Sequence, residues 1–232
     1  MFIPLRINYI MIIRFFLFLS ICYASGLSAQ ERQTAGQVGS TSTVITGFLT
    51  KPAIQVDGNT IEGNRFLFEN WKNNGELYSK GRTLKLENIN YDIYNNQFSE
   101  FRSIDTLFIF ENKLIDSARI NGRCLKPDTS KKFKEVLLEG EKINLYKVYK
   151  TEIVEGMFNP IDGSKQPSRF KITDDYLILK NDISKSFSLS KKEISEAVKD
   201  HSSEIEKYID ENNLSYKKEA DVISIFKYYN TL

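Results

Sequence analysis

The spacing of apolar residues changes once along this chain, at Ser190, and this change limits the folds that the chain can adopt. Before it, from about residue 60, short alternating runs are separated by turn-forming Asn, Gly and Pro, which is typical of antiparallel strands. After it, apolar residues recur every three or four positions, as on one helix face. Strands followed by helices predict an α+β fold. We therefore predict an antiparallel twisted β-sheet or incomplete barrel, followed by three C-terminal helices.

Two parts of the strand region give the clearest local predictions. Residues 65–71 and 76–79 flank Asn74 and Gly75. An Asn-Gly pair between such runs predicts a hairpin, because both residues accept positive φ. Residues 106–110 are more uniformly apolar, with Thr106 followed by four large apolar residues, which predicts a central strand that is buried on both faces.

The helical region contains two sequences that could begin helices. Ser190 with Glu193, and Ser203 with Glu206, have the spacing of a capping box, in which each side chain satisfies a backbone group of the first helical turn. A third helix is predicted over residues 217–229. Its inner face is expected to consist of four apolar positions at helical spacing: Val222, Ile225, Phe226 and Tyr229.

Residues 1–29 have the composition of an export signal. Arg14 precedes an apolar run, and small residues lead to Ala29. We expect cleavage after Ala29 and export to the periplasm or the cell surface. Three alternatives remain open: a start at Met11, a permanent membrane anchor, and a lipoprotein modified at Cys22. The apolar run is short of the ~20 residues that a spanning helix needs, so no stable membrane span is expected after cleavage.

The remaining boundaries follow from composition. Residues 30–59 begin with a stretch rich in Gly, Ser, Thr and Gln, which predicts a flexible leader with a possible first strand near its end. Residues 60–189 form the predicted antiparallel β region. Residues 190–232 form the predicted helical region, which we expect to pack on the sheet as one domain with residues 60–189.

Charge and rare residues exclude several functions. Arg6 and Arg14 leave with the signal, so 30 basic and 30 acidic residues remain. A neutral chain lacks the basic surface that binds phosphate, and we expect no nucleic acid partner. Cys124 is then the only cysteine and His201 the only histidine. These residues allow no disulfide within the chain and no two-histidine metal site, so no metal and no cofactor are expected.

The search for a site finds aromatic residues rather than catalytic ones. No nucleophile, phosphate-binding or metal motif occurs, and no catalytic residue is predicted. Aromatic residues on predicted strands could form one surface that grips a ligand, although ordinary packing in a core is the alternative. The candidate ligand-facing residues are Tyr78, Tyr91, Tyr94 and Phe98.

Two stretches, residues 65–98 and 204–232, resemble a family of exported proteins without an assigned function from bacteria with an outer membrane. The similarity spans most of residues 60–232. It implies export and a shared fold, and it offers no catalytic residues for this chain.

Two functions of different classes follow from these expectations. The first is a non-enzymatic binding or interaction module of the cell envelope, with an envelope component or a glycan as its partner. The second is a carboxylate-dependent hydrolase acting on cell-wall or glycan material. A deep pocket with two inward-facing carboxylates would favour the hydrolase. A shallow aromatic groove, or no groove, would favour the binding module.

Overall fold

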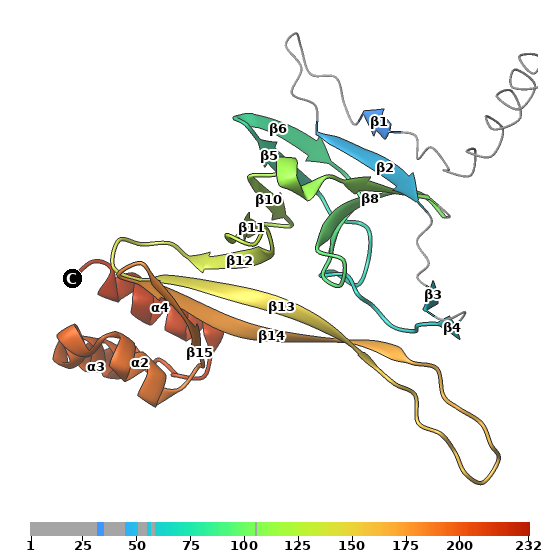
Figure 1. The fold of residues 1–232 in the computed structure, drawn as a ribbon. Helices are drawn as coiled ribbons and strands as arrows, with labels where there is room; N and C mark the ends of the chain where they lie inside the picture. Colours follow the sequence, from blue (N-terminus) through green and yellow to red (C-terminus); the bar gives the residue numbers. More distant parts are fainter. Residues whose placement is uncertain (1–31, 35–44, 51–54, 57–58, 105) are drawn as a thin grey trace, which may run out of the picture. The chain divides into compact units, whose positions relative to one another are not determined.

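The computed structural model describes residues 32–34, 45–50, 55–56, 59–104 and 106–232 (Figure 1). The predicted export signal lies outside the described residues, as does most of the predicted leader. The leader prediction is wrong at one point, because residues 32–34 form strand β1. The possible first strand near the end of the leader is confirmed as β2.

The chain forms two antiparallel sheets whose strands alternate along the sequence, and neither sheet closes into a barrel. The first has five strands, and the second has eight. The five-stranded sheet has the order β1 (Arg32–Thr34), β2 (Thr46–Thr50), β9 (Thr106–Phe110), β8 (Gln97–Ser103) and β7 (Ile89–Asp92). The segment 106–110 is an inner strand, as predicted, and its four apolar residues are all buried.

The eight-stranded sheet carries most of the second half of the β region. Its order is β15 (Ile183–Phe187), β14 (Arg169–Lys180), β13 (Asn144–Val154), β12 (Phe133–Leu138), β11 (Arg123–Pro127), β10 (Ser117–Ile120), β5 (Gly75–Ser79) and β6 (Arg82–Leu86). A separate small hairpin joins β3 (Gln55–Val56) to β4 (Asn59–Thr60), and one 3₁₀ turn, η1, covers Asn112–Leu114.

The hairpin predicted around Asn74 and Gly75 is wrong. Residues 65–71 form no strand but an irregular segment that lies alongside β7. There, Leu67 N donates to Tyr91 O, and Asn90 Nδ2 donates to Phe68 O. Backbone bonds thus join the two segments near Leu67, and the Asn90 side-chain amide replaces them at Phe68. Strand β5 instead pairs with β6 through Lys80 and Gly81, which both have positive φ.

Three helices end the chain, so the predicted α+β class with three C-terminal helices is confirmed. They are α2 (Lys191–Ala197), α3 (Ser202–Glu211) and α4 (Glu219–Tyr229), with a 3₁₀ turn η2 (Lys199–His201) after α2. Ser190 caps α2 by accepting from Glu193 N at 3.4 Å, as predicted. The second capping box is wrong, because α3 already begins at Ser202 and the Ser203 hydroxyl donates to Glu204.

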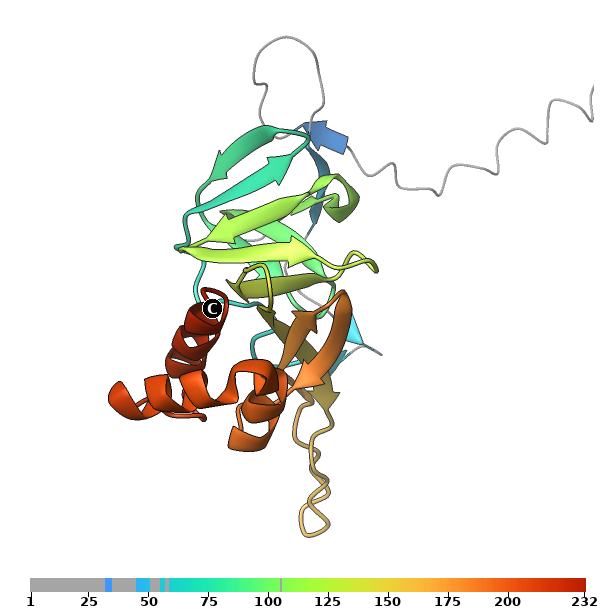
Figure 2. The ribbon, with the colours of Figure 1, turned by 90° about the vertical axis from the view of Figure 1, so that its left-hand side faces the viewer.

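One face of the eight-stranded sheet supports two separate cores. At the β5–β6 end, the five-stranded sheet packs on it and closes the first core, which includes Leu77, Ala118 and Leu125. At the β13–β15 end, the helices pack on it and close the second core, which includes Phe187 (Figure 2). All four predicted inner residues of α4 are at most 1% exposed and belong to this second core.

Strand register shows that polar residues separate the two cores. Residues directly opposite one another on paired strands share a face. One such row runs across seven strands: Leu77, Ala118, Leu125, Glu135, Lys147, Tyr176 and Phe187. Its two ends lie in the two cores, and its middle is Glu135, Lys147 and Tyr176. We call this middle, with its partners described below, the polar seam.

Candidate functional site

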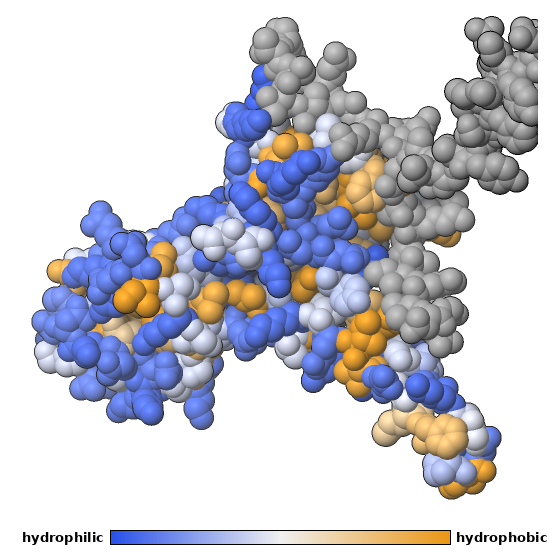
Figure 3. Space-filling model, viewed as in Figure 1, coloured by the Kyte–Doolittle hydropathy of each residue, from blue (hydrophilic) through white to orange (hydrophobic). Residues whose placement is uncertain are grey.

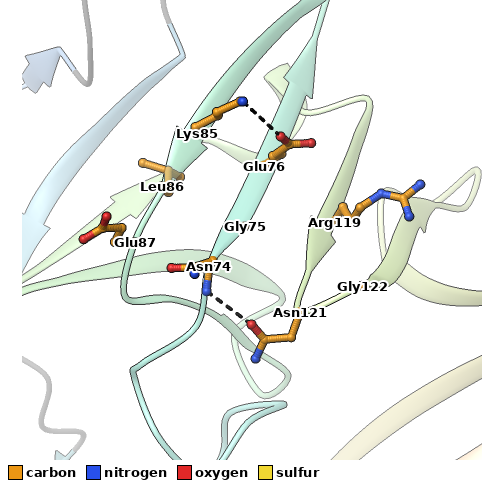
Figure 4. A pocket seen from close by; sticks show the side chains of 9 residues that line it. All are labelled: Asn74, Gly75, Glu76, Lys85, Leu86, Glu87, Arg119, Asn121 and Gly122. Carbon is orange, nitrogen blue, oxygen red and sulfur yellow. Dashed lines mark hydrogen bonds and ion pairs between the residues drawn. The ribbon is translucent and has the colours of Figure 1, made fainter.

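A pocket of about 660 Å³ opens at the loop end of strands β5, β6 and β10 (Figure 4). We call it the β5–β10 pocket. Most of its lining residues carry polar side chains: Asn74, Gly75, Glu76, Lys85, Leu86, Glu87, Arg119, Asn121 and Gly122.

Three charged side chains of this pocket are aligned by strand pairing. Glu76 on β5 lies directly opposite both Lys85 on β6 and Arg119 on β10. The neighbouring Leu77 is buried in the first core, and successive side chains of a strand point to opposite faces. The Lys85–Glu76–Arg119 row therefore lies on the face of the sheet that points away from the first core.

The Glu76 carboxylate is held in place by two neighbours. Its Oε1 lies 3.9 Å from Lys85 Nζ, and its Oε2 accepts a hydrogen bond from the Tyr78 hydroxyl. The hydrogen bond to Glu76 raises the pKa of Tyr78, with burial as a smaller cause. Tyr78 therefore remains a neutral donor and fixes the orientation of Glu76.

Two asparagines fix the loops at the rim of the pocket. Asn74 N donates to Asn121 Oδ1 at 3.2 Å, and Asn121 N donates to Asn74 O at 3.0 Å. Asn121 Nδ2 also donates to Asn73 Oδ1 at 2.7 Å. Asn121 and Gly122 both have positive φ, which the tight turn from β10 to β11 requires. The rim is thus held by hydrogen bonds among its own residues.

The four predicted ligand-facing aromatics do not form one surface. Tyr91 and Phe98 are 3% and 0% exposed, and their rings pack 5.0 Å apart in the first core, so the prediction is wrong for both. Tyr94 is 41% exposed and packs against Phe170 instead. Only Tyr78 lies beside the β5–β10 pocket, through its contact with Glu76.

Sequence reasoning missed the residues that do converge: Asn74, Glu76, Arg119 and Asn121. The only signals for them were the turn pairs Asn74-Gly75 and Asn121-Gly122, because the pairing of β5 with β10 joins strands about 40 residues apart. Cys124 lies on β11 as a free, partly exposed cysteine rather than a fully buried one.

A second pocket, of about 760 Å³, lies where the helices meet the end of the β14–β15 hairpin. Lys180 is its centre: Nζ donates to Tyr229 Oη at 2.6 Å, to Ala197 O at 2.7 Å and to Asp200 Oδ1 at 3.0 Å. The Tyr229 hydroxyl in turn donates to Asp200 Oδ2 at 2.7 Å. Burial raises the pKa of Asp200, but the hydrogen bonds from Tyr229 and Lys180 outweigh it and lower the pKa to about 2.

This lowered pKa predicts a pH-dependent contribution to stability. The folded-state pKa lies below the reference value of 3.8, so the Asp200 interactions stabilise the fold above about pH 4 and are lost as pH falls toward 2. Asp200→Asn should lower the melting temperature at pH 6, and the difference from wild type should shrink as pH falls below 4. A difference that stays constant down to pH 2, or an equal effect in a Lys180→Met background, would contradict this account.

The polar seam is satisfied by its own residues. Arg123 donates to both Glu135 oxygens, at 2.8 and 2.5 Å, and the Tyr149 hydroxyl donates to Glu135 at 2.5 Å. Lys147 and the Tyr176 hydroxyl donate to Glu219, the first residue of α4, at 2.9 and 2.7 Å. These bonds tie the helices to the sheet between the two cores.

The Glu219 carboxylate of the seam is poorly suited to acid catalysis. Burial raises the pKa of Glu219, but hydrogen bonds from Lys147 and Tyr176 outweigh it and hold the pKa below its usual value. A glycosidase acid requires the opposite shift. The seam therefore supports a structural role.

In the described part of the chain, no helix is long and apolar enough to cross a membrane. Comparisons of the chain with protein-family models, with curated proteins and with solved structures gave no match.

Proposed function

We propose that this protein is a non-enzymatic binding module of the cell envelope, and that the β5–β10 pocket binds a glycan. The observation that carries the proposal is the Lys85–Glu76–Arg119 row beside Asn74 and Asn121 in an open pocket. Sugar hydroxyl groups both donate and accept hydrogen bonds. Arginine and lysine donate, carboxylates accept, and amides do both, so this set can pair with neighbouring hydroxyls.

The balance of charge favours a neutral ligand. Lys85 and Arg119 are opposed by Glu76 and Glu87 among the lining residues, so the pocket attracts neither anions nor cations strongly. The fixed rim also supports binding, because a preformed site loses little conformational entropy when its ligand arrives.

The hydrolase alternative receives less support from this pocket. Glu76 and Glu87 could form a carboxylate pair in principle. Figure 4 shows the Glu76 carboxylate turned toward Lys85 rather than toward Glu87. A glycosidase needs its two carboxyl groups to face each other across the scissile bond.

Calorimetric titration with soluble cell-wall oligosaccharides tests this proposal. Arg119→Ala should weaken binding about tenfold or more, because a hydrogen bond to a charged group contributes about 1.5–3 kcal/mol. Lys150→Ala is the matched control, since it removes an exposed cation on β13, away from the pocket. Binding unaffected by Arg119→Ala, or no binding of any oligosaccharide, would refute the site. Release of shortened products during the titration would instead favour the hydrolase.

A further inference from the structure

Strands β13 and β14 continue past the polar seam into a hairpin that extends away from the helices (Figures 1 and 2). Their pairing is unbroken from Asn144 opposite Leu179 to Val154 opposite Arg169. Residues 155–168 then close the hairpin, and we call them the hairpin tip.

The hairpin tip exposes three large apolar side chains. Met157, Phe158 and Ile161 are 73%, 63% and 94% exposed. Figure 3 shows hydrophobic colour at the end of this hairpin. The strands that lead to it expose charged side chains, such as Lys150 and Lys171, and one apolar side chain, Ile172, at 36%. Apolar residues gathered at one exposed place indicate a surface that another body covers.

Several backbone N–H groups of the tip donate hydrogen bonds within the tip itself. Asn159 N, Gly163 N and Gln166 N donate to carbonyl oxygens within the tip, at 2.8–3.0 Å. Ile161 N and Ser164 N donate to the side chains of Asn159 and Asp162, at 3.0 and 2.9 Å. Pro160 and Pro167 have no N–H to satisfy. These five donors keep their partners when the centre of the tip leaves water, which lowers the cost of moving it.

Gly156 allows the two sides of the tip to approach closely. A Cβ atom at this position would lie 1.7 Å from Gln166 O, so a larger residue would push the strands apart. The apolar side chains are therefore presented on a preformed support.

The size of the tip favours a membrane over a protein partner. A stable protein interface buries about 1,200–2,000 Å² and uses about 20–30 residues on each side. The tip has 14 residues and three large apolar side chains at its end. A bilayer surface can accept such a small projection without a matching shape.

Charge at the tip selects the kind of bilayer. Lys165 lies 3.8 Å from Glu155 and balances it, which leaves Asp162 as an unbalanced acid. Hydrogen bonds from Ser164 lower the pKa of Asp162, so it stays ionised. This charge is repelled by anionic headgroups and is compatible with the ammonium group of a zwitterionic lipid.

We propose that the hairpin tip inserts Met157, Phe158 and Ile161 into the interface of a zwitterionic lipid bilayer and attaches the protein there reversibly. Three side chains provide weak attachment, comparable to a single lipid chain. The inference is independent of glycan binding, because it uses a different surface.

Vesicles of phosphatidylcholine and phosphatidylethanolamine are the probe. We expect the full chain to co-sediment with these vesicles. Phe158→Ser and Ile161→Ser should each weaken this partitioning about tenfold, because each removes one large apolar side chain from the bilayer interface. Partitioning should not increase when phosphatidylglycerol is added or when salt is lowered. Ile183→Ser is the matched control, because Ile183 is 67% exposed on β15 and should leave partitioning unchanged.

A local readout separates the tip from any other membrane-binding segment. Wild type has one tryptophan, and Phe158→Trp adds a second one at the tip. The additional fluorescence emission of this variant should shift to shorter wavelength when vesicles are added. No shift, or equal co-sedimentation of wild type and the Met157→Ser, Phe158→Ser, Ile161→Ser triple variant, would overturn the proposal and favour a protein partner for the tip.

Discussion

Replacing Phe226 by alanine is expected to lower the free energy of unfolding by about 3–5 kcal/mol. Phe226 is fully buried on α4, and its ring centroid lies 5.6 Å from that of Phe187 on β15. Removing the ring would open a cavity in the second core, between helix and sheet. An isolated helix of this length is marginal in water, so its stability depends on this packing.

Denaturant unfolding of Phe226→Ala and Lys227→Ala measures this effect. Lys227 is exposed on the same helix, so its replacement should change stability by less than about 0.5 kcal/mol. If deletion of residues 217–232 left the remaining chain with an unchanged melting temperature, α4 would be a detachable segment and the packing argument would fail.

The second large effect is expected at the ion pair of Arg65 and Asp92. Arg65 Nε donates to Asp92 Oδ2 at 2.6 Å, with the two side chains 9% and 0% exposed. Asp92 also accepts from the backbone and side-chain nitrogens of Asn95. Arg65→Met should destabilise the protein by about 3–5 kcal/mol, because it leaves a buried carboxylate without its cation.

The double variant Arg65→Met, Asp92→Leu distinguishes this cause from simple loss of packing. It should recover much of the stability, since it removes the unpaired charge. Lys207→Met, which breaks an exposed pair with Glu211, should cost less than about 1 kcal/mol. Unfolding curves in which the double variant is as unstable as Arg65→Met would contradict the charge argument.

Local patterns in the sequence correctly predicted those features that depend on residues close together in the chain. The inner face of α4, the cap at Ser190 and the buried strand over residues 106–110 are all confirmed. Each depends on a spacing of a few residues, which helix and strand geometry determines.

The errors occur where distant segments decide the structure. Residues 65–71 alternate like a strand, but the buried pair of Arg65 with Asp92 and the amide of Asn90 hold them in an irregular segment beside β7. Tyr91 and Phe98 lie on segments that were predicted as strands, and we expected both side chains to face a ligand. In the five-stranded sheet, both side chains point into the first core instead. Sequence alone does not show which strands become neighbours.

The same limit explains why the candidate site was missed. Glu76 meets Arg119 only because β10 pairs with β5. The separation of the two cores by a polar seam likewise depends on the register of β12, β13 and β14. These pairings join distant segments and leave no local spacing to recognise.

The central claim is that the β5–β10 pocket binds a neutral glycan. Nuclear magnetic resonance titration of the ¹⁵N-labelled protein with cell-wall oligosaccharides tests it most directly. We expect the largest shifts at the backbone amides of Asn74 and Glu76, the Arg119 Nε–H and the side-chain amide of Asn121, with the oligosaccharide recovered unchanged. Shifts confined to the second pocket, no shifts at saturating oligosaccharide, or conversion of the oligosaccharide to shorter products would contradict the claim.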